Sequence, residues 1–191
     1  MTPRPVGKAV ASLSDGELLA RVAAGEYASL APVYDRHHEA VARFVARALG
    51  GSHDVEDIVQ ETFLCAARKA ASFDGRLGCR PWLLGIAARQ ILHVRRTFAR
   101  LRGMLDRYRQ LDAPTPPPDP HEGASLREEH WRLERAIGRL SESKRIVLLM
   151  AEIEEMSGEQ ISAALGIPVG TVWTRLHHAR RELRHALEEG S

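Results

Sequence analysis

The chain is short of several residue types, and each shortage excludes a class of protein. Only 5% of its 191 residues are aromatic, and its two cysteines, Cys65 and Cys79, match no metal-ligand spacing. Two thiols without a secretory signal indicate a reducing compartment rather than a disulfide scaffold. No apolar run approaches the roughly 20 residues that a membrane span needs, and the first residues hold too short an apolar stretch for a signal peptide. We therefore expect a cytoplasmic protein without direct membrane insertion.

The chain also lacks a large excess of either positive or negative charge. The formal net charge is only +2, so a general polycation is excluded, and any affinity for nucleic acid must come from local clustering. Ala, Leu and Arg are abundant, and apolar residues recur at steps of three and four, which is typical of amphipathic helices. The sequence therefore predicts an all-α fold.

Proline divides the chain. Residues 112–125 hold five of the ten prolines and show no apolar periodicity, so they predict a flexible linker that is partly polyproline II. We expect one small helical domain at residues 13–111 and a second at 126–189, with a loose tail at 1–12.

The most informative stretch is residues 157–187, which predict two helices joined by a short turn. Gly166 suits a left-handed C-cap, and Pro168 stiffens the turn and begins the next helix. The second helix has an apolar stripe and an opposite face of hydrogen-bond donors and cations. The stripe consists of Val169, Val172, Leu176, Ala179, Leu183 and Leu187, and the opposite face of Thr171, Thr174, Arg175, His178 and Arg181. This pattern favours a DNA-binding helix-turn-helix over an ordinary helical hairpin.

A second basic element lies in the first domain. A helix predicted from Pro81 to Tyr108 belongs to a stretch, residues 76–109, with nine arginines and a single acid, Asp106. Such bias suits nucleic acid better than a solvated face of mixed sign. Trp82 heads the helix, where it can stack on a base or belong to the core.

The helix predicted at residues 54–71 has a face that solubility does not explain. That face carries Asp57, Gln60, Glu61, Leu64 and Arg68, and an exposed leucine among charges slightly favours protein docking. The adjacent histidines His37 and His38 fit a solvated or packed pair better than a metal site, since no partner has the matching spacing.

Two strings carry a family resemblance. DVEDIVQETF followed by FDGRLGCRPWLLGIAARQ, and LGIPVGTVWTRLHHARREL near the end, resemble bacterial RNA polymerase sigma factors. The match is to the small extracytoplasmic-function (ECF) group, which keeps only the second and fourth conserved regions. The resemblance implies a non-enzymatic promoter-specificity subunit that needs no cofactor or metal. It also implies core RNA polymerase and promoter DNA as partners, and an anti-sigma factor, often membrane-bound, as inhibitor.

The resemblance assigns roles to named residues. Polymerase docking falls to Asp57, Gln60, Glu61 and Leu64. The minus-10 element and its melted non-template strand fall to a loop and the helix that follows it. These contribute Phe73, Asp74, Arg76, Arg80, Trp82, Arg89, Gln90, His93 and Arg96. Base edges of the double-stranded minus-35 element fall to Thr171, Thr174, Arg175 and His178, and phosphates to Lys144, Arg180, Arg181 and Arg184.

Two departures from the family pattern and two alternatives stay open. Gln90 replaces a frequent Asn, and the large Trp173 lies between the base-reading face and the core stripe. A free-standing helix-turn-helix regulator explains residues 157–187 but not the first domain. A metal-dependent hydrolase would need His37, His38, Asp54 and Asp57 on one wall, and no phosphate loop accompanies them.

Overall fold

The computed structural model describes residues 12–50, 54–106 and 125–188, and within these it contains helices and no strand. The predicted all-α class is confirmed. The tail and most of the proline-rich linker lie outside the described residues, and the domain boundaries stay predictions. In the described part of the chain, no helix is both long and apolar enough to cross a membrane.

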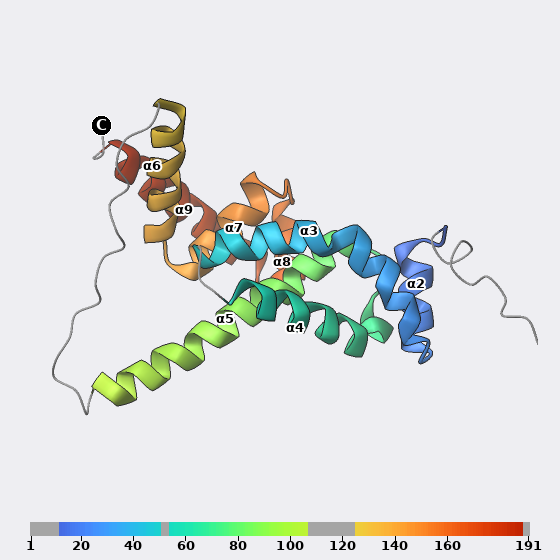
Figure 1. Ribbon diagram of the computed structural model, residues 1–191. Coiled ribbons are helices and arrows are strands. Elements are labelled where there is room, and N and C mark those ends of the chain that lie inside the picture. The colour runs from blue at the N-terminus through green and yellow to red at the C-terminus, as the bar shows by residue number, and fades with distance from the viewer. Residues whose placement is uncertain (1–11, 51–53, 107–124, 189–191) are drawn as a thin grey trace, which may run out of the picture.

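The described residues of the N-terminal half form four α-helices and two 3₁₀ turns (Figure 1). Helix α2 (Asp15–Ala23) is followed by η1 (Tyr27–Ser29), α3 (Leu30–Leu49), α4 (Val55–Arg68), η2 (Ala70–Ser72) and α5 (Cys79–Asp106). Ser14 and Glu17 form a capping box, with the Glu17 amide donating to the Ser14 hydroxyl at 3.3 Å. Gly50 ends α3 in the left-handed conformation, with φ of 66°.

The C-terminal half consists of α6 (Ser125–Arg139), α7 (Glu142–Glu152), α8 (Gly158–Leu165) and α9 (Val169–Glu188). Ser157 caps α8 in a second capping box with Gln160, and Gly166 ends it with φ of 69°. The carbonyl of Pro168 accepts the first bonds of α9, so the proline precedes that helix instead of beginning it.

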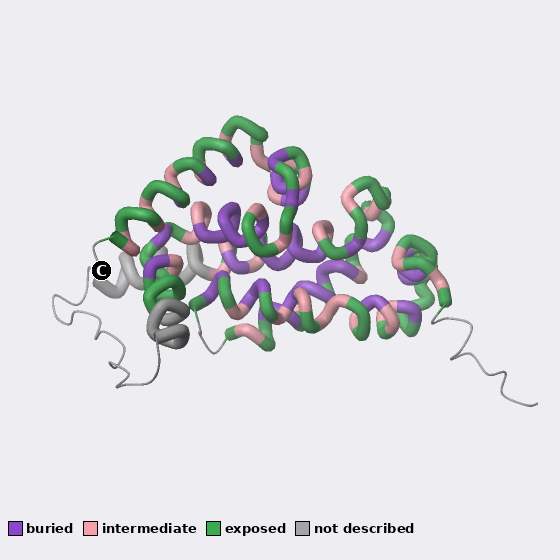
Figure 2. Tube along the Cα trace, turned by 90° about the horizontal axis from the view of Figure 1, so that it is seen from above, coloured by how far each residue is buried: buried purple, intermediate pink, exposed green. Residues whose placement is uncertain are grey.

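Helix α5 is the centre of the molecule. In Figure 1 it runs beside α3 and α4, and its last turns project away from the other helices. Helix α8 of the C-terminal half also packs against it, and α7 packs against α3. The view from above shows the buried segments gathered along this middle layer, with the outer helices exposed (Figure 2).

The two halves share one hydrophobic core. Phe44 and Leu83 of the N-terminal half and Ile146 and Ile161 of the C-terminal half belong to the same cluster of buried side chains. The helices of the two halves therefore form one packed body, although the sequence predicted two domains separated by a linker.

Two expected details of the helices are wrong. Helix α5 begins at Cys79, two residues before Pro81. Its described part runs to Asp106, and the predicted end at Tyr108 lies outside the described residues. Val169, placed on the buried stripe of the last helix, is 39% exposed because it lies in the first turn of α9, beyond the packing of α8.

Candidate polymerase and nucleic-acid interfaces

The outer face of α4 is open. Ile58, Val59 and Phe63 are buried on the core side, whereas Leu64 on the opposite side is 54% exposed. Asp57 and Gln60 are exposed, Glu61 is half-buried, and the carboxylate of Glu61 accepts a hydrogen bond from Arg68. The four predicted docking residues therefore form a continuous solvent-facing strip with one apolar side chain among polar ones.

The loop before α5 is a compact turn. Asp74 Oδ1 accepts a hydrogen bond from the Arg76 amide at 3.0 Å, and Gly75 and Gly78 take φ of 73° and 76°, which favours glycine. Phe73 meets Trp82 edge to face with ring centroids 5.1 Å apart. Both rings are half-buried, so Trp82 is neither wholly core nor wholly free to stack.

The predicted strand-binding residues of α5 lie in different environments. Arg89 and His93 are exposed and Gln90 is half-buried, while the side chain of Arg96 lies outside the described residues. Arg80 donates a hydrogen bond to Glu154, which lies just after α7 in the other half. The structure thus brings Arg80 to a partner that the sequence did not indicate.

Helix α9 presents its predicted base-reading face to solvent. Thr174 is exposed, and Thr171, Arg175 and His178 are half-buried, while Val172, Leu176 and Ala179 on the other side are buried. The Thr174 hydroxyl donates to the Gly170 carbonyl at 2.9 Å, so it keeps lone pairs and can reorient toward a ligand. Residues at steps of three and four on an open face suit a helix in the major groove.

The Trp173 side chain of α9 packs against the start of α8 and so joins the two helices of the helix-turn-helix. A Cβ built on Gly158, at the start of α8, would meet the Trp173 indole at 2.5 Å, so the glycine makes room for the ring. The other half of the ring is free, since Trp173 is 50% exposed. The sequence could not place this side chain because the glycine that receives it lies 15 positions away.

Several predicted phosphate-binding cations are engaged within the protein. Lys144 Nζ lies 2.6 Å from Glu182 Oε1, and Arg180 Nε donates to Glu152 Oε1 at 2.8 Å. Burial raises the pKa of Glu182 less than the hydrogen bond from Lys144 lowers it, so the Glu182 carboxylate stays ionised. Arg184 is exposed. Lys144 and Arg180 would have to exchange these carboxylates for phosphates on binding DNA.

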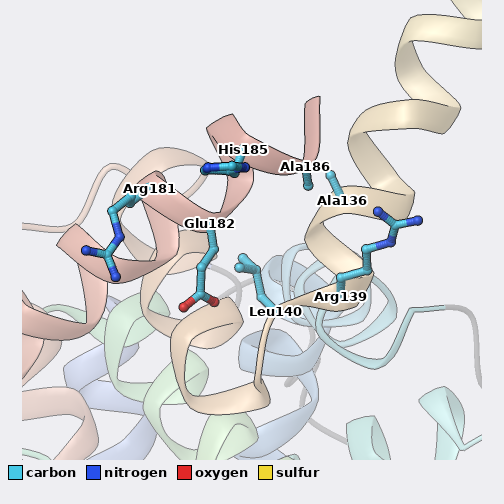
Figure 3. A pocket seen from close by; sticks show the side chains of 7 residues that line it. All are labelled: Ala136, Arg139, Leu140, Arg181, Glu182, His185 and Ala186. Carbon is cyan, nitrogen blue, oxygen red and sulfur yellow. The ribbon is translucent and has the colours of Figure 1, made fainter. Parts of the chain in front are cut away.

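A groove that we did not expect from the sequence separates α6 from the last turns of α9 (Figure 3). The figure shows Arg139 and Arg181 on opposite sides with Leu140 between them. The lining residues are Ala136, Arg139, Leu140, Arg181, Glu182, His185 and Ala186. Residues 181, 182, 185 and 186 share one side of α9, and this spacing was the signal that could have found the groove.

The residues of the hydrolase alternative do not share a wall. His37 Nε2 lies 2.7 Å from Asp15 Oδ2, and His38 stacks on Tyr34 with centroids 4.6 Å apart. Cys79 joins Asp15 and His37 in a group whose possible ligand atoms lie within 4.8 Å of one another. Arg36 already pairs with Asp15 at 2.7 Å, and burial raises the pKa of the Cys79 thiol to about 12. We therefore describe this group as a contact that holds α2 and α3 to the start of α5.

Comparison with known proteins identifies both halves. Residues 33–101 match the family model for sigma-70 region 2, and residues 130–183 match that for sigma-70 region 4. The ECF RNA polymerase sigma factor SigL of Mycobacterium tuberculosis is 34% identical over 168 residues, covering 87% of this chain and 93% of SigL. SigW of Bacillus subtilis is 30% identical, with 88% and 94% covered.

The fold agrees with solved structures. The structure of CnrH in complex with the cytosolic domain of CnrY matches with a TM-score of 0.60 at 29% identity, covering 93% of this chain and 99% of CnrH. RpoE from Bartonella quintana, solved with the anti-sigma factor NepR, has the same TM-score at 23% identity and supports the fold. The two family models, the relatives that match over most of their length and the solved structures all indicate the same family. The chain therefore belongs to the ECF sigma factors, the subunits that direct RNA polymerase to promoters, and it is not a free-standing regulator.

Proposed function

We propose that this sigma factor binds the polymerase through α4, reads the minus-35 element with α9, and recognises and melts the minus-10 element with α5 and the loop before it. It does so in the cytoplasm and without catalytic chemistry of its own. The observation that carries this proposal is the division of surfaces. Helix α4 presents an exposed strip of acidic and polar residues with one leucine, and α9 presents an accessible polar face. Arg89 and His93 of α5 are exposed as a third surface, which suits the DNA between the polymerase and the minus-35 element.

The docking role is tested by Leu64→Asp. An apolar side chain that is 54% exposed contributes by burial against a partner, and a charge in its place leaves an unpaired carboxylate in the contact. We expect at least tenfold weaker binding to core polymerase and an unchanged circular dichroism spectrum. Tyr27→Asp is the matched control, because Tyr27 is 69% exposed and lies outside α4. Equal affinity of the Leu64→Asp variant and wild type would contradict the docking surface.

We also propose that an anti-sigma factor holds this chain inactive. The similarity to CnrH, solved with the cytosolic domain of CnrY, supports this proposal. An inhibitor of this kind, purified with the chain from its native cell, should abolish promoter-specific transcription by the reconstituted holoenzyme when it is added back. Retrieval of core polymerase alone under every growth condition would contradict it.

A further inference from the structure

Three side chains of the kinds that bind metals meet where α2, α3 and α5 come together. Asp15 is the first residue of α2, His37 lies within α3, and Cys79 is the first residue of α5. One possible ligand atom from each lies within 4.8 Å of the other two. These side chains form the contact described above, and they belong to none of the proposed polymerase or DNA surfaces.

The donor set suits a zinc ion. Zinc binds thiolate sulfur, imidazole nitrogen and carboxylate oxygen, and in open sites it takes three protein ligands and a water. Neighbouring ligand atoms around a tetrahedral zinc ion lie roughly 3.3–3.7 Å apart, as follows from bonds of about 2.1 Å to nitrogen and oxygen and about 2.3 Å to sulfur. The three atoms here reach that spacing through small shifts of their side chains. Hard cations such as Mg²⁺ prefer oxygen ligands, so the sulfur and the nitrogen select against them.

The Cys79 thiol is available as a ligand. Cys79 is 6% exposed, and among the described residues no atom accepts a hydrogen bond from its sulfur. The side chains of His37 and Asp15 are 15% and 25% exposed, so an ion can reach the group from solvent. A buried sulfur beside an imidazole and a carboxylate thus has no other polar partner to give up.

Arg36 orients the carboxylate and leaves one of its oxygens for an ion. Arg36 Nη1 lies 2.7 Å from Asp15 Oδ1, whereas His37 Nε2 lies 2.7 Å from Asp15 Oδ2. A hydrogen bond to the far oxygen of a ligating carboxylate fixes its direction and supports metal binding. The pair between Arg36 and Asp15 can therefore persist while Oδ2 binds a metal.

We propose that Asp15 Oδ2, His37 Nε2 and Cys79 Sγ bind a zinc ion, with water as the fourth ligand. On binding, the Cys79 S–H bond breaks, a Zn–S bond forms and the proton passes to the buffer, because a coordinating thiol is deprotonated. The proton between His37 Nε2 and Asp15 Oδ2 leaves that position, so that both atoms bind the ion. The ion joins α2, α3 and α5 by one bond each, and it stabilises the folded chain by mass action.

Cobalt binding by the full chain, prepared without a polyhistidine tag, tests the ligands. Co²⁺ occupies zinc sites, and a cobalt–thiolate bond gives a charge-transfer absorption band. We expect one Co²⁺ per chain with this band, and displacement by Zn²⁺ but not by Mg²⁺. Cys79→Ser should lose the band and bind about tenfold more weakly or worse. Cys65→Ser, which changes the other buried cysteine, is the control and should keep both the band and the affinity.

His37→Gln and His38→Gln form a second matched pair. Both histidines are half-buried on α3, but His37 meets Asp15 whereas His38 stacks on Tyr34. Zn²⁺ should raise the melting temperature of wild type, Cys65→Ser and His38→Gln, and it should leave those of Cys79→Ser and His37→Gln unchanged. If Cys79→Ser does not fold, as circular dichroism would reveal, the histidine pair decides alone.

A wild-type chain that shows no saturable cobalt binding would overturn the proposal. So would a charge-transfer band that persists in Cys79→Ser, or a zinc-dependent rise in melting temperature that persists in His37→Gln. None of these readouts requires transcription, so the zinc site and the proposed function are tested separately.

Discussion

The helices proposed to meet DNA, α5 and α9, differ in accessibility. On α9 the proposed base-reading side is accessible, with Thr174 exposed and Thr171, Arg175 and His178 half-buried, and the opposite side is buried in the C-terminal half. On α5 the middle is buried on every side, and Arg80 at its start is paired with Glu154. The proposed minus-35 reader is thus accessible in the free chain, while the proposed minus-10 helix is partly covered by the half that carries that reader.

The two proposed targets also differ in the form of DNA that each helix would bind. Double-stranded DNA presents its base edges without rearrangement, so a reader of the major groove can stay exposed. A melted strand exists only after base pairs have been broken, which costs a few kcal/mol per extruded base. A strand-binding helix that is partly covered by α8 has to be uncovered there before a strand can follow its whole length.

The largest effect is expected at the base of the seam, the contact of α7 and α8 with α3 and α5. Arg145 is 7% exposed and donates to the carbonyls of Ile137, Ala48, Gly138 and Leu140. Arg145→Met would leave buried acceptors unsatisfied, and we expect a loss of about 3 kcal/mol in the free energy of unfolding, measured in urea. Arg139→Met, which changes an exposed arginine, should cost little. If the two arginines proved equivalent, the seam would not be a packed part of the fold.

A smaller and sequence-dependent effect is expected on α9. Arg175→Ala removes a side chain from the open face and should weaken binding to the preferred minus-35 duplex by about 1–3 kcal/mol. On a duplex changed at the contacted base pair, the Arg175→Ala variant should bind about as tightly as wild type does. Fluorescence anisotropy with both duplexes measures the difference, and an identical loss on the two would contradict a base-reading role.

Arg184 provides the contrast within the same helix. It is exposed on the later turns of α9, and we propose that it contacts phosphate. Arg184→Ala should weaken all duplexes about equally and lower the slope of log K against log salt by about 1. A salt titration of binding measures this slope. An unchanged slope would place Arg184 outside the contact.

The smallest effect concerns the contact that holds α2 and α3 at the start of α5. Burial raises the pKa of Asp15, but hydrogen bonds from His37 and Arg36 outweigh it and keep that pKa below 3.8. A lowered folded pKa stabilises the protein above pH 3.8, and this contribution disappears as the pH falls through the folded value.

Asp15→Asn should therefore cost up to about 1 kcal/mol at pH 7, and the difference from wild type should vanish below the folded pKa. Thermal unfolding at several pH values measures it, with the exposed Asp35→Asn as control. A difference that persisted at the lowest pH would mean that charge at Asp15 does not matter.

Local signals in the sequence were sufficient for most of the helices. The Ser14–Glu17 capping box and the terminal glycines Gly50 and Gly166 determine helix ends through contacts a few residues apart. The exposed Leu64 and the open face of α9 also followed from helical periodicity. These features depend only on neighbours in the chain, and such features can be read from it.

The seam could not be predicted, because it joins residues far apart in the sequence. Glu154 lies just after α7, yet its partner Arg80 lies 74 positions away in the sequence. Gly85 is the point where Ala164 approaches α5, and a glycine within a helix does not indicate which distant residue packs against it. A proline-rich linker indicated freedom between the halves and contained no information about the packing that they adopt.

The distance between the halves, with and without core polymerase, tests the central claim most directly. Spin labels on Glu39→Cys in α3 and His177→Cys in α9 occupy exposed sites, and the native Cys65 and Cys79 are buried. Double electron–electron resonance should give one short distance for the free chain and a longer one for the complex with core polymerase. The same distance in both states, or a long distance in the free chain, would contradict the covered minus-10 helix.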